Sequence, residues 1–135
     1  MVSYTTSADG IRESELGGFF VGWPSHPTPG KHLELLQKSD RVVLAIDDET
    51  RQVVGFVTAV TDGVLSAYIP FLEVLPAYQA QGIGSELIRR MLTELKGSYM
   101  IDLLCDPELQ SFYEKLGMEK ATGMRIRNFD RQSGT

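Results

Sequence analysis

The sequence contains little cysteine, little histidine and no excess of positive charge, and each shortage excludes a class of protein. A single cysteine, Cys105, cannot form an internal disulfide. Lysine and arginine number 13 against 18 acidic residues, for a net charge of −5, whereas nucleic-acid binders usually present a basic face. Two histidines, His26 and His32, are too few for a metal site without further ligands. We therefore expect no metal and no nucleic-acid partner.

Long hydrophobic runs are also missing. No stretch of about 18 apolar residues occurs, so we expect no membrane span. Residues 1–6 lack the basic and apolar regions of a signal peptide, which favours a cytoplasmic location. The chain is otherwise ordinary for a globular protein, with 42% hydrophobic and 23% charged residues. Its length suits a single domain that covers residues 1–135.

Residues 72–95 hold the clearest pattern: an apolar strand, a turn with two glycines, and an amphipathic helix. Six apolar side chains between Ile83 and Leu95 recur at helical spacing. Gly82 and Gly84 lie where this helix begins, and a residue without a Cβ lets a ligand approach the backbone closely. The first N–H groups of a helix have no internal partner and lie at the positive end of its dipole. The pattern therefore predicts a phosphate site at the start of the helix.

The rest of the chain predicts a mixture of strands and helices. Strands are expected at residues 2–7, 42–46, 53–60, 64–75, 99–104 and 121–126, and helices at 11–20, 31–38, 83–96 and 107–117. Asp62-Gly63 is the signal of a tight hairpin. Asp106 before Pro107 suits a helix start, with the aspartate as the cap. Pro70 inside a strand marks an unpaired or bulged position, which would expose backbone groups around Leu72–Val74.

Two motifs resemble those of the GNAT superfamily of acyl-CoA N-acyltransferases. Residues 79–84, Gln-Ala-Gln-Gly-Ile-Gly, resemble its Gln/Arg-x-x-Gly-x-Gly/Ala signature. Residues 112–118, Phe-Tyr-Glu-Lys-Leu-Gly-Met, are similar to its Leu/Phe-Tyr-x-x-x-Gly-Phe stretch. With the strands around them, the two motifs cover roughly residues 41–127. The resemblance implies an α+β fold with a mixed, mostly antiparallel central sheet that is splayed near Leu72–Val74 and has helices on both faces.

The resemblance also implies acetyl-CoA as cosubstrate. The loop amides would hold its pyrophosphate, and the main chain at Leu72 and Val74 would hydrogen-bond its pantetheine, with the Val74 N–H as oxyanion donor. The implied cofactor-binding residues are Leu72, Val74, Gln79, Ala80, Gln81, Gly82, Ile83, Gly84, Ser85 and Tyr113. Where many relatives carry Asn-x-x-Ala, this chain has Asp106, whose carboxylate cannot donate to the pantetheine as an asparagine does.

Two side chains are the expected catalytic residues. By resemblance, the Tyr113 hydroxyl would protonate the leaving thiolate; its helical spacing fits a core tyrosine equally well. Glu73 is the single acid in an otherwise apolar strand and would take the proton of the amine, directly or through water. Asp102, on the neighbouring strand, is the rival base. For Glu73 a solvated strand position or a salt bridge is the alternative interpretation.

Four aromatic residues are candidates for the acceptor pocket: Phe19, Phe20, Trp23 and Tyr68. They fit the edge of a hydrophobic core equally well. With Glu73 and Asp102 nearby the pocket would be acidic, which favours an amine. Cys105 has no histidine near it in sequence, so a packed thiol is favoured over a nucleophile.

Together these features predict an N-acetyltransferase that moves an acetyl group from acetyl-CoA to a primary amine of a small molecule. Two alternatives stay open: a non-catalytic acyl-CoA sensor, and an acetyltransferase acting on a protein lysine or N-terminus. Small domains of this type often form homodimers, so pairing is a further expectation. A dinucleotide-binding fold is disfavoured because Leu87 occupies the third glycine position, and no Gly-Lys-Ser/Thr follows as a P-loop requires.

Overall fold

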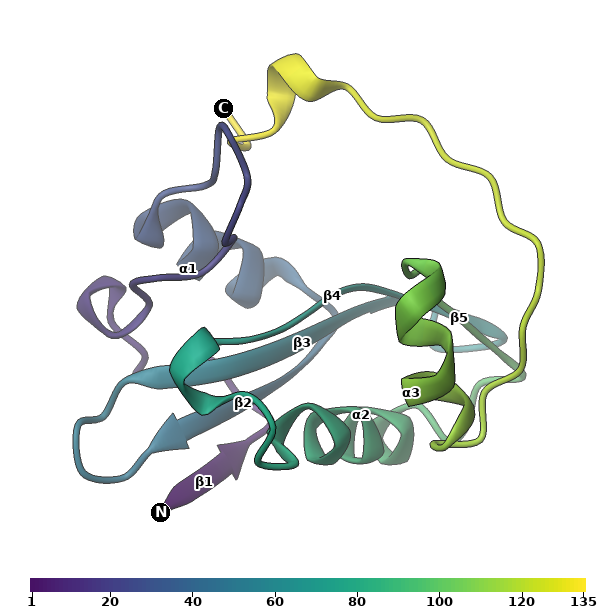
Figure 1. Ribbon diagram of the computed structural model, residues 1–135, viewed down its shortest axis with the longest axis horizontal. Helices are drawn as coiled ribbons and strands as arrows, with labels where there is room; N and C mark the ends of the chain where they lie inside the picture. Colours follow the sequence, from purple (N-terminus) through teal and green to yellow (C-terminus); the bar gives the residue numbers. More distant parts are fainter.

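One five-stranded sheet in the order β1-β2-β3-β4-β5 forms the centre of the computed structural model, which describes residues 1–135 (Figure 1). The strands are β1 (Val2–Thr5), β2 (Arg41–Asp47), β3 (Val53–Thr61), β4 (Ser66–Val74) and β5 (Met100–Asp102). Neighbours are antiparallel from β1 to β4, whereas β4 and β5 are parallel. The expected α+β fold with a mixed, mostly antiparallel sheet is therefore confirmed.

Helices cover both faces of the sheet. The α-helices are α1 (Pro29–Lys38), α2 (Ile83–Glu94) and α3 (Gln110–Glu114). Short 3₁₀ turns are η1 (Glu13–Glu15), η2 (Pro76–Tyr78), η3 (Pro107–Leu109) and η4 (Phe129–Arg131). Helix α1 packs on one face and α2 and α3 on the other, so the domain has three layers (Figure 1).

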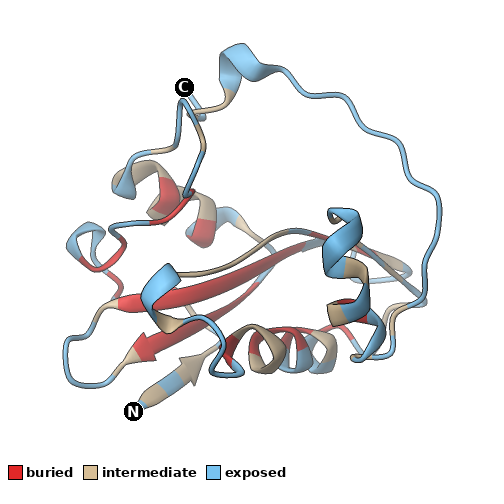
Figure 2. Cartoon of the chain, viewed as in Figure 1, coloured by how far each residue is buried: buried red, intermediate tan, exposed pale blue.

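Two hydrophobic cores lie on opposite faces of the sheet. Along β2, Val43 and Ala45 join the core under α2, whereas Val42, Leu44 and Ile46 join the core under α1. Figure 2 shows the buried residues concentrated in the central strands and on the inner sides of α1 and α2. Because both faces are covered, β2 and β3 read as continuous apolar runs rather than as alternating ones.

The sheet divides between β4 and β5, as the sequence predicts. Only three pairs join these strands, from Ser66 with Met100 to Tyr68 with Asp102, while β4 continues to Val74. The register against β3 shifts between the pairs made by Tyr68 and Phe71, and Pro70 lies within this irregularity. The predicted break at the proline is confirmed.

The backbone of β4 presents hydrogen-bonding groups on its unpaired side. The Leu75 N–H donates to the Val54 carbonyl at 2.9 Å, so the odd-numbered residues at this end of β4 face β3. The N–H and C=O groups of Leu72 and Val74 therefore point away from β3, toward the side where β5 has ended.

Helix α2 lies very close to the sheet at Gly55 of β3. A Cβ there would approach Leu87 Cδ1 to 3.0 Å and Ile83 Cγ2 to 3.3 Å, both tighter than ordinary packing. The glycine thus allows the first turns of α2 to pack against the strand. Gly55 pairs with Val74 at the end of β4, so this contact also fixes the start of α2 beside the end of β4.

Two expected elements are wrong. Residues 11–20 do not form a helix but contain only the 3₁₀ turn η1, because Gly18 and Phe20 adopt left-handed φ values of 94° and 62° that an α-helix cannot include. Residues 121–126 do not form a strand within the chain, because the extended segment has no partner strand beside it.

Several boundaries and turns also differ from expectation. The tight hairpin is instead a loop of residues 62–65, in which the Asp62 carboxylate accepts from the N–H groups of Val64, Leu65 and Ser66; these bonds hold its pKa well below the usual range. The expected Asp106 side-chain cap is wrong, since only its backbone carbonyl accepts, from Leu109. The helix expected over 107–117 is divided into η3 and α3, and the strand expected over 99–104 shortens to β5.

His32, in α1, is the most unusual buried polar residue. Its imidazole is 1% exposed, and neither ring nitrogen has a hydrogen-bond partner. The rings of Phe19, Phe20 and Phe56 surround it with centroids 5.2, 4.9 and 4.4 Å away. Burial among these rings lowers the pKa of His32 from 6.5 to about 4, because the charged imidazolium would lose its hydration.

We predict that His32 makes the fold sensitive to mild acid. The unfolded chain takes up a proton below pH 6.5 and the folded chain only near pH 4, so the free energy of unfolding falls by about 3 kcal/mol as the pH drops through this interval. In His32→Leu, the free energy of unfolding measured with urea should not show this fall. At pH 7 it should equal or exceed that of the parent, since two unpaired polar atoms are removed. His26→Leu, at an exposed position, is the control and should keep the fall.

Candidate active site

The segment between β4 and α2 is a loop with a special backbone. Ala80 and Gly82 adopt left-handed φ values of 62° and 84°, and Gly82 forms the N-cap of α2. The first helical hydrogen bond is donated by Glu86 to the Gly82 carbonyl, at 3.1 Å. None of the N–H groups of residues 80–85 donates to another group of the chain. Six consecutive free amides at the positive end of a helix suit a phosphate or diphosphate.

Two side-chain bonds hold this loop against the sheet. The Gln79 side-chain amide donates to the Val74 carbonyl at 3.0 Å, which connects the loop to the open edge of β4. The Tyr78 hydroxyl donates to the Asp47 carboxylate at 2.7 Å, at the end of β2. This bond lowers the pKa of Asp47 and raises that of Tyr78. No local sequence pattern predicts the Tyr78–Asp47 bond, because its two residues lie 31 positions apart.

Tyr113 lies in α3 with its ring buried against the α2 core and only 9% exposed. Its neighbour Phe112 meets it edge-on, with centroids 4.9 Å apart. Burial, with a smaller contribution from Cys105, raises the pKa of Tyr113 to about 12. The phenol therefore keeps its proton at neutral pH and can donate it.

A cavity of about 500 Å³ adjoins Tyr113 on the far side of β5. Tyr68 and Asp102 line it from the paired ends of β4 and β5, and residues 119–127 form its outer wall. Asp102 is exposed and lies in this cavity. The structure thus brings Asp102 together with Tyr113 rather than with the loop that Glu73 contacts.

Glu73 holds the loop that follows η1. Its two carboxylate oxygens accept from the backbone N–H groups of Phe20 and Val21, at 2.9 and 3.2 Å. Phe20 has a left-handed φ of 62°, and these bonds offset the cost of that conformation. The half-buried carboxylate therefore joins the open end of β4 to a segment more than 50 residues earlier. Each oxygen keeps further lone pairs that can accept from an amine or a water.

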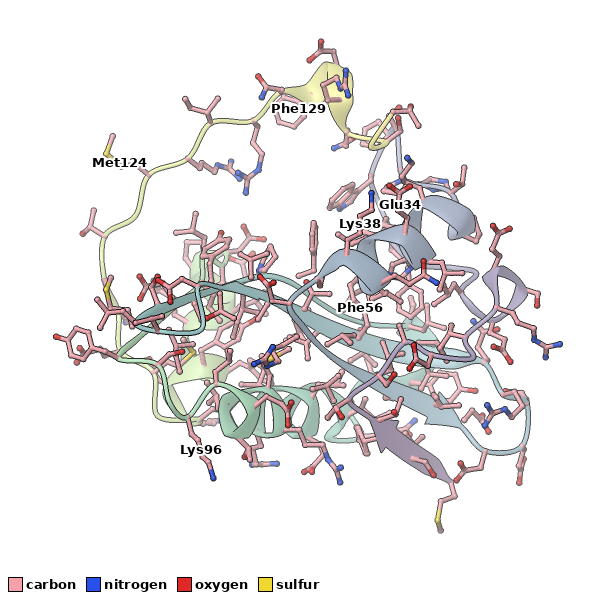
Figure 3. All side chains as sticks on the ribbon, turned by 180° about the vertical axis from the view of Figure 1, so that it is seen from behind. Glu34, Lys38, Phe56, Lys96, Met124 and Phe129 are labelled. Atoms are coloured by element: carbon pink, nitrogen blue, oxygen red, sulfur yellow. The ribbon has the colours of Figure 1, made fainter.

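A second cavity, of about 400 Å³, lies on the α1 face beside this loop. Its apolar walls are Phe20, Trp23 and Phe71, whose rings contact one another with centroids 5.0 to 6.3 Å apart. Its charged lining residues are Lys31, Glu34, Lys38 and Arg131. Figure 3 shows Glu34 and Lys38 on α1, and the Glu34 carboxylate accepts from both lysines at 3.0 and 3.2 Å.

The four aromatic candidates do not form one pocket. Phe20 and Trp23 line the cavity on the α1 face, whereas Tyr68 lines the cavity beside Tyr113. Phe19 is a core residue packed against Phe56, as the alternative interpretation states. The expected acidic character is wrong for the cavity on the α1 face, since three cations and one carboxylate line it.

Cys105 and the histidines supply no further chemistry. The Cys105 thiol packs against the α2 core, and burial together with Asp106 and Glu108 raises its pKa, which keeps it protonated. No group of three or more histidine, cysteine, aspartate or glutamate residues could hold a metal ion. No helix has the length and apolar character needed to cross a membrane.

Comparison with known proteins places this geometry among acetyltransferases. The model of the acetyltransferase (GNAT) family matches residues 8–118. GCN5-related N-acetyltransferase 1, chloroplastic, of Arabidopsis thaliana is 32% identical over 115 residues, which cover 82% of this chain and 58% of that protein. The chain thus spans less than two thirds of the length of the curated relatives it matches first.

Two solved structures match this chain over more of its length than the curated relatives do. A crystal structure described as that of an acetyltransferase from Deinococcus radiodurans R1 is 45% identical, with a TM-score of 0.96, and the match covers 99% of this chain and 93% of that one. A GNAT-family acetyltransferase from Streptococcus pneumoniae TIGR4 is 31% identical, with a TM-score of 0.76, over 95% of this chain and 98% of that one. Nearly the whole chain is therefore similar to these acetyltransferase structures, over nearly their whole length.

We predict that Glu73→Gln loosens the Phe20–Val21 loop. The amide offers one acceptor oxygen, so its NH₂ group must face the second backbone N–H. We expect a loss of about 1–2 kcal/mol in the free energy of unfolding and faster amide hydrogen exchange at Phe20 and Val21. Glu94→Gln, an exposed acid on α2, is the control. Unchanged exchange at both amides would contradict the assignment.

Proposed function

Because this chain belongs to the GNAT acetyltransferase family, we propose that it moves an acetyl group from acetyl-CoA to a primary amine of a small molecule. The observation that carries the proposal is the open edge of β4 directly beside six free amides. An extended, partly peptide-like arm ending in a diphosphate matches both features at once. The family relationship supports acetyl transfer, and the geometry supports the assignment of residues.

The cosubstrate would lie along the open edge of β4. The loop from Gln79 to Ser85 offers the free amides of residues 80–85 and the helix dipole to the diphosphate. The backbone groups of Leu72 and the Val74 N–H are available to amides of the pantetheine, as another strand would use them, while the Val74 carbonyl already accepts from the Gln79 side chain. When bound, acetyl-CoA supplies the thioester carbonyl that an amine attacks. The Val74 N–H is the proposed donor to the oxygen on which negative charge develops.

Proton transfers require one acid and one base. Tyr113 is the proposed acid, because its raised pKa keeps the hydroxyl protonated until it donates to the leaving thiolate. Glu73 is the proposed base, acting directly or through a water with the lone pairs that the loop amides leave free. Asp102 stays the alternative base, from the cavity beside Tyr113. The Glu73 carboxylate also orders the Phe20–Val21 loop beside the α1-face cavity. Binding of the acceptor in that cavity would therefore be coupled to proton removal by Glu73.

The α1-face cavity is the proposed acceptor site. Its aromatic walls suit an apolar portion of the acceptor, and Lys31, Lys38 and Arg131 favour one that also bears a carboxylate or phosphate. A volume of about 400 Å³ suits a small molecule, whereas a protein acceptor needs an open groove. Acetylation of a protein amine and an acyl-CoA sensor role stay as alternatives. The cytoplasmic location also stays a prediction.

We predict that Gly82→Asp weakens coenzyme A binding at least about tenfold relative to Gly82→Asn. Both side chains tolerate the left-handed φ of 84°, and a Cβ at this position meets no atom within 4 Å. The two variants differ in one negative charge beside the proposed diphosphate site. Isothermal titration calorimetry at low salt measures the ratio of the two coenzyme A dissociation constants. Equal affinities would contradict the assignment of the diphosphate site to this loop.

We predict that Tyr113→Phe lowers kcat by about 10²-fold or more while coenzyme A affinity changes little. In the parent, kcat/KM should rise with pH as the amine loses its proton, without an alkaline decline below pH 10, because the pKa of Tyr113 is about 12. Thiol release measured against a panel of amines, amino acids and peptides tests this. An absence of turnover across the panel, with coenzyme A binding intact, would favour the sensor alternative.

A further inference from the structure

The end of the chain forms one wall of the α1-face cavity. Residues 129–134, here named the C-terminal turn, begin with η4 and lie beside α1 (Figure 1). Three of them, Arg131, Gln132 and Gly134, line the cavity together with residues of α1 and the aromatic walls. All three lie beyond residues 8–118, the part that the family model matches, so this wall is not described by the family pattern.

The C-terminal turn is held in place by contacts with the body. The Gln132 side-chain oxygen accepts from the Ser25 N–H at 3.0 Å. Gly134 has a left-handed φ of 81° and lies against Lys31, since a Cβ there would come within 3.1 Å of Lys31 Cγ. The Gly134 N–H also donates to the Arg131 carbonyl at 3.0 Å. Arg131 therefore belongs to an anchored turn rather than to a free tail.

The cavity is basic, although the chain as a whole has a net charge of −5. Its charged lining consists of three cations, Lys31, Lys38 and Arg131, and one carboxylate, Glu34. Glu34 accepts from both lysines, at 3.0 and 3.2 Å, so their charges are partly balanced. Arg131 takes part in no ion pair within the chain. Its guanidinium is thus the cation of this cavity that remains available to an anion.

The proposed base lies at the border of the cavity, whereas the cations line it. Glu73 is not a lining residue and reaches the border through its bonds to the N–H groups of Phe20 and Val21. The apolar part of the lining consists largely of three aromatic rings, those of Phe20, Trp23 and Phe71. An acceptor whose amine lies at Glu73 would therefore place its other end among these rings and the cations.

We propose that Arg131 selects the acceptor, which is an amine joined through an apolar portion to an acidic group that pairs with the Arg131 guanidinium. This inference rests on the proposed function, because it takes the α1-face cavity as the acceptor site. A carboxylate or a phosphate would serve, since the planar fork of an arginine binds two oxygens of either group. An amine without the acidic group would occupy the aromatic part and leave the guanidinium unpaired.

The position of Arg131 separates acceptor selection from cosubstrate binding. The free amides of residues 80–85 lie at the start of α2, on the other face of the sheet. The C-terminal turn contacts α1 and the loop that contains Ser25, on the α1 face. A change at Arg131 should therefore alter the affinity for acidic acceptors and leave the affinity for coenzyme A as it is.

The test compares matched acceptors that differ in the acidic group. The probes are benzylamine, the meta and para isomers of (aminomethyl)benzoate, and the para phosphonate analogue. Calorimetry measures their binding to the full chain loaded with coenzyme A, and thiol release from acetyl-CoA measures turnover. The parent should bind at least one acidic probe about tenfold or more tightly than benzylamine. The benzoate and phosphonate arms show which acidic group it prefers.

Arg131→Gln should weaken binding of the preferred acidic probe at least about tenfold and raise its KM by a similar factor, with kcat and benzylamine binding unchanged. Arg131→Lys keeps the charge without the planar fork and should fall between the parent and Arg131→Gln. A merely structural role of this exposed side chain would shift all probes alike. Lys96→Gln removes an exposed cation on the α2 side, outside both cavities (Figure 3), and is the matched control.

Two results overturn the inference: equal affinity of the parent for benzylamine and every acidic probe, or acidic-probe affinities that Arg131→Gln leaves unchanged. Turnover of benzylamine in that case keeps the proposed acetyl transfer. Tight binding of an acidic probe that depends on Arg131, with no turnover of any amine, supports the inference and contradicts the proposed function. The two failures are therefore distinguishable.

Discussion

The separation of β4 from β5 after three residue pairs is the constraint on which the site depends. If the two strands stayed paired to Val74, the backbone groups of Leu72 and Val74 would be used inside the sheet. Pro70 lies in the irregularity that precedes this open stretch, and the short β5 ends at Asp102. The sheet therefore gives up ladder bonds on one side of β4, and those groups become available to a ligand.

Glu73 connects this open edge to the α1 face of the domain. Its backbone belongs to β4, and its carboxylate holds the Phe20–Val21 loop that borders the aromatic cavity. The loop of free amides, where we propose that the diphosphate binds, lies at the start of α2, on the other face. Two ligands approaching from opposite faces would thus meet at the single strand between them.

The sequence allowed most of the fold to be predicted, because the decisive signals are local. The helical stripe from Ile83 to Leu95, the glycine loop and Pro70 each act within a few residues, and each was recognised. The failures involve distant partners. Whether residues 121–126 form a strand depends on a neighbouring strand, and whether Glu73 is free depends on amides more than 50 residues away. Left-handed backbone at Phe20 has no sequence signal at a non-glycine residue.

The close packing of α2 against Gly55 fixes the position of the helix start before any ligand binds. Since even a methyl group at Gly55 would press on Leu87 and Ile83 more tightly than ordinary packing, α2 has little freedom to slide or tilt on β3, and its first amides keep their direction in the absence of any ligand. Binding of an anion at these amides would therefore cost little conformational entropy. Rigid-body docking onto this end of the molecule is accordingly a sound way to compare candidate cosubstrates with different acyl chains.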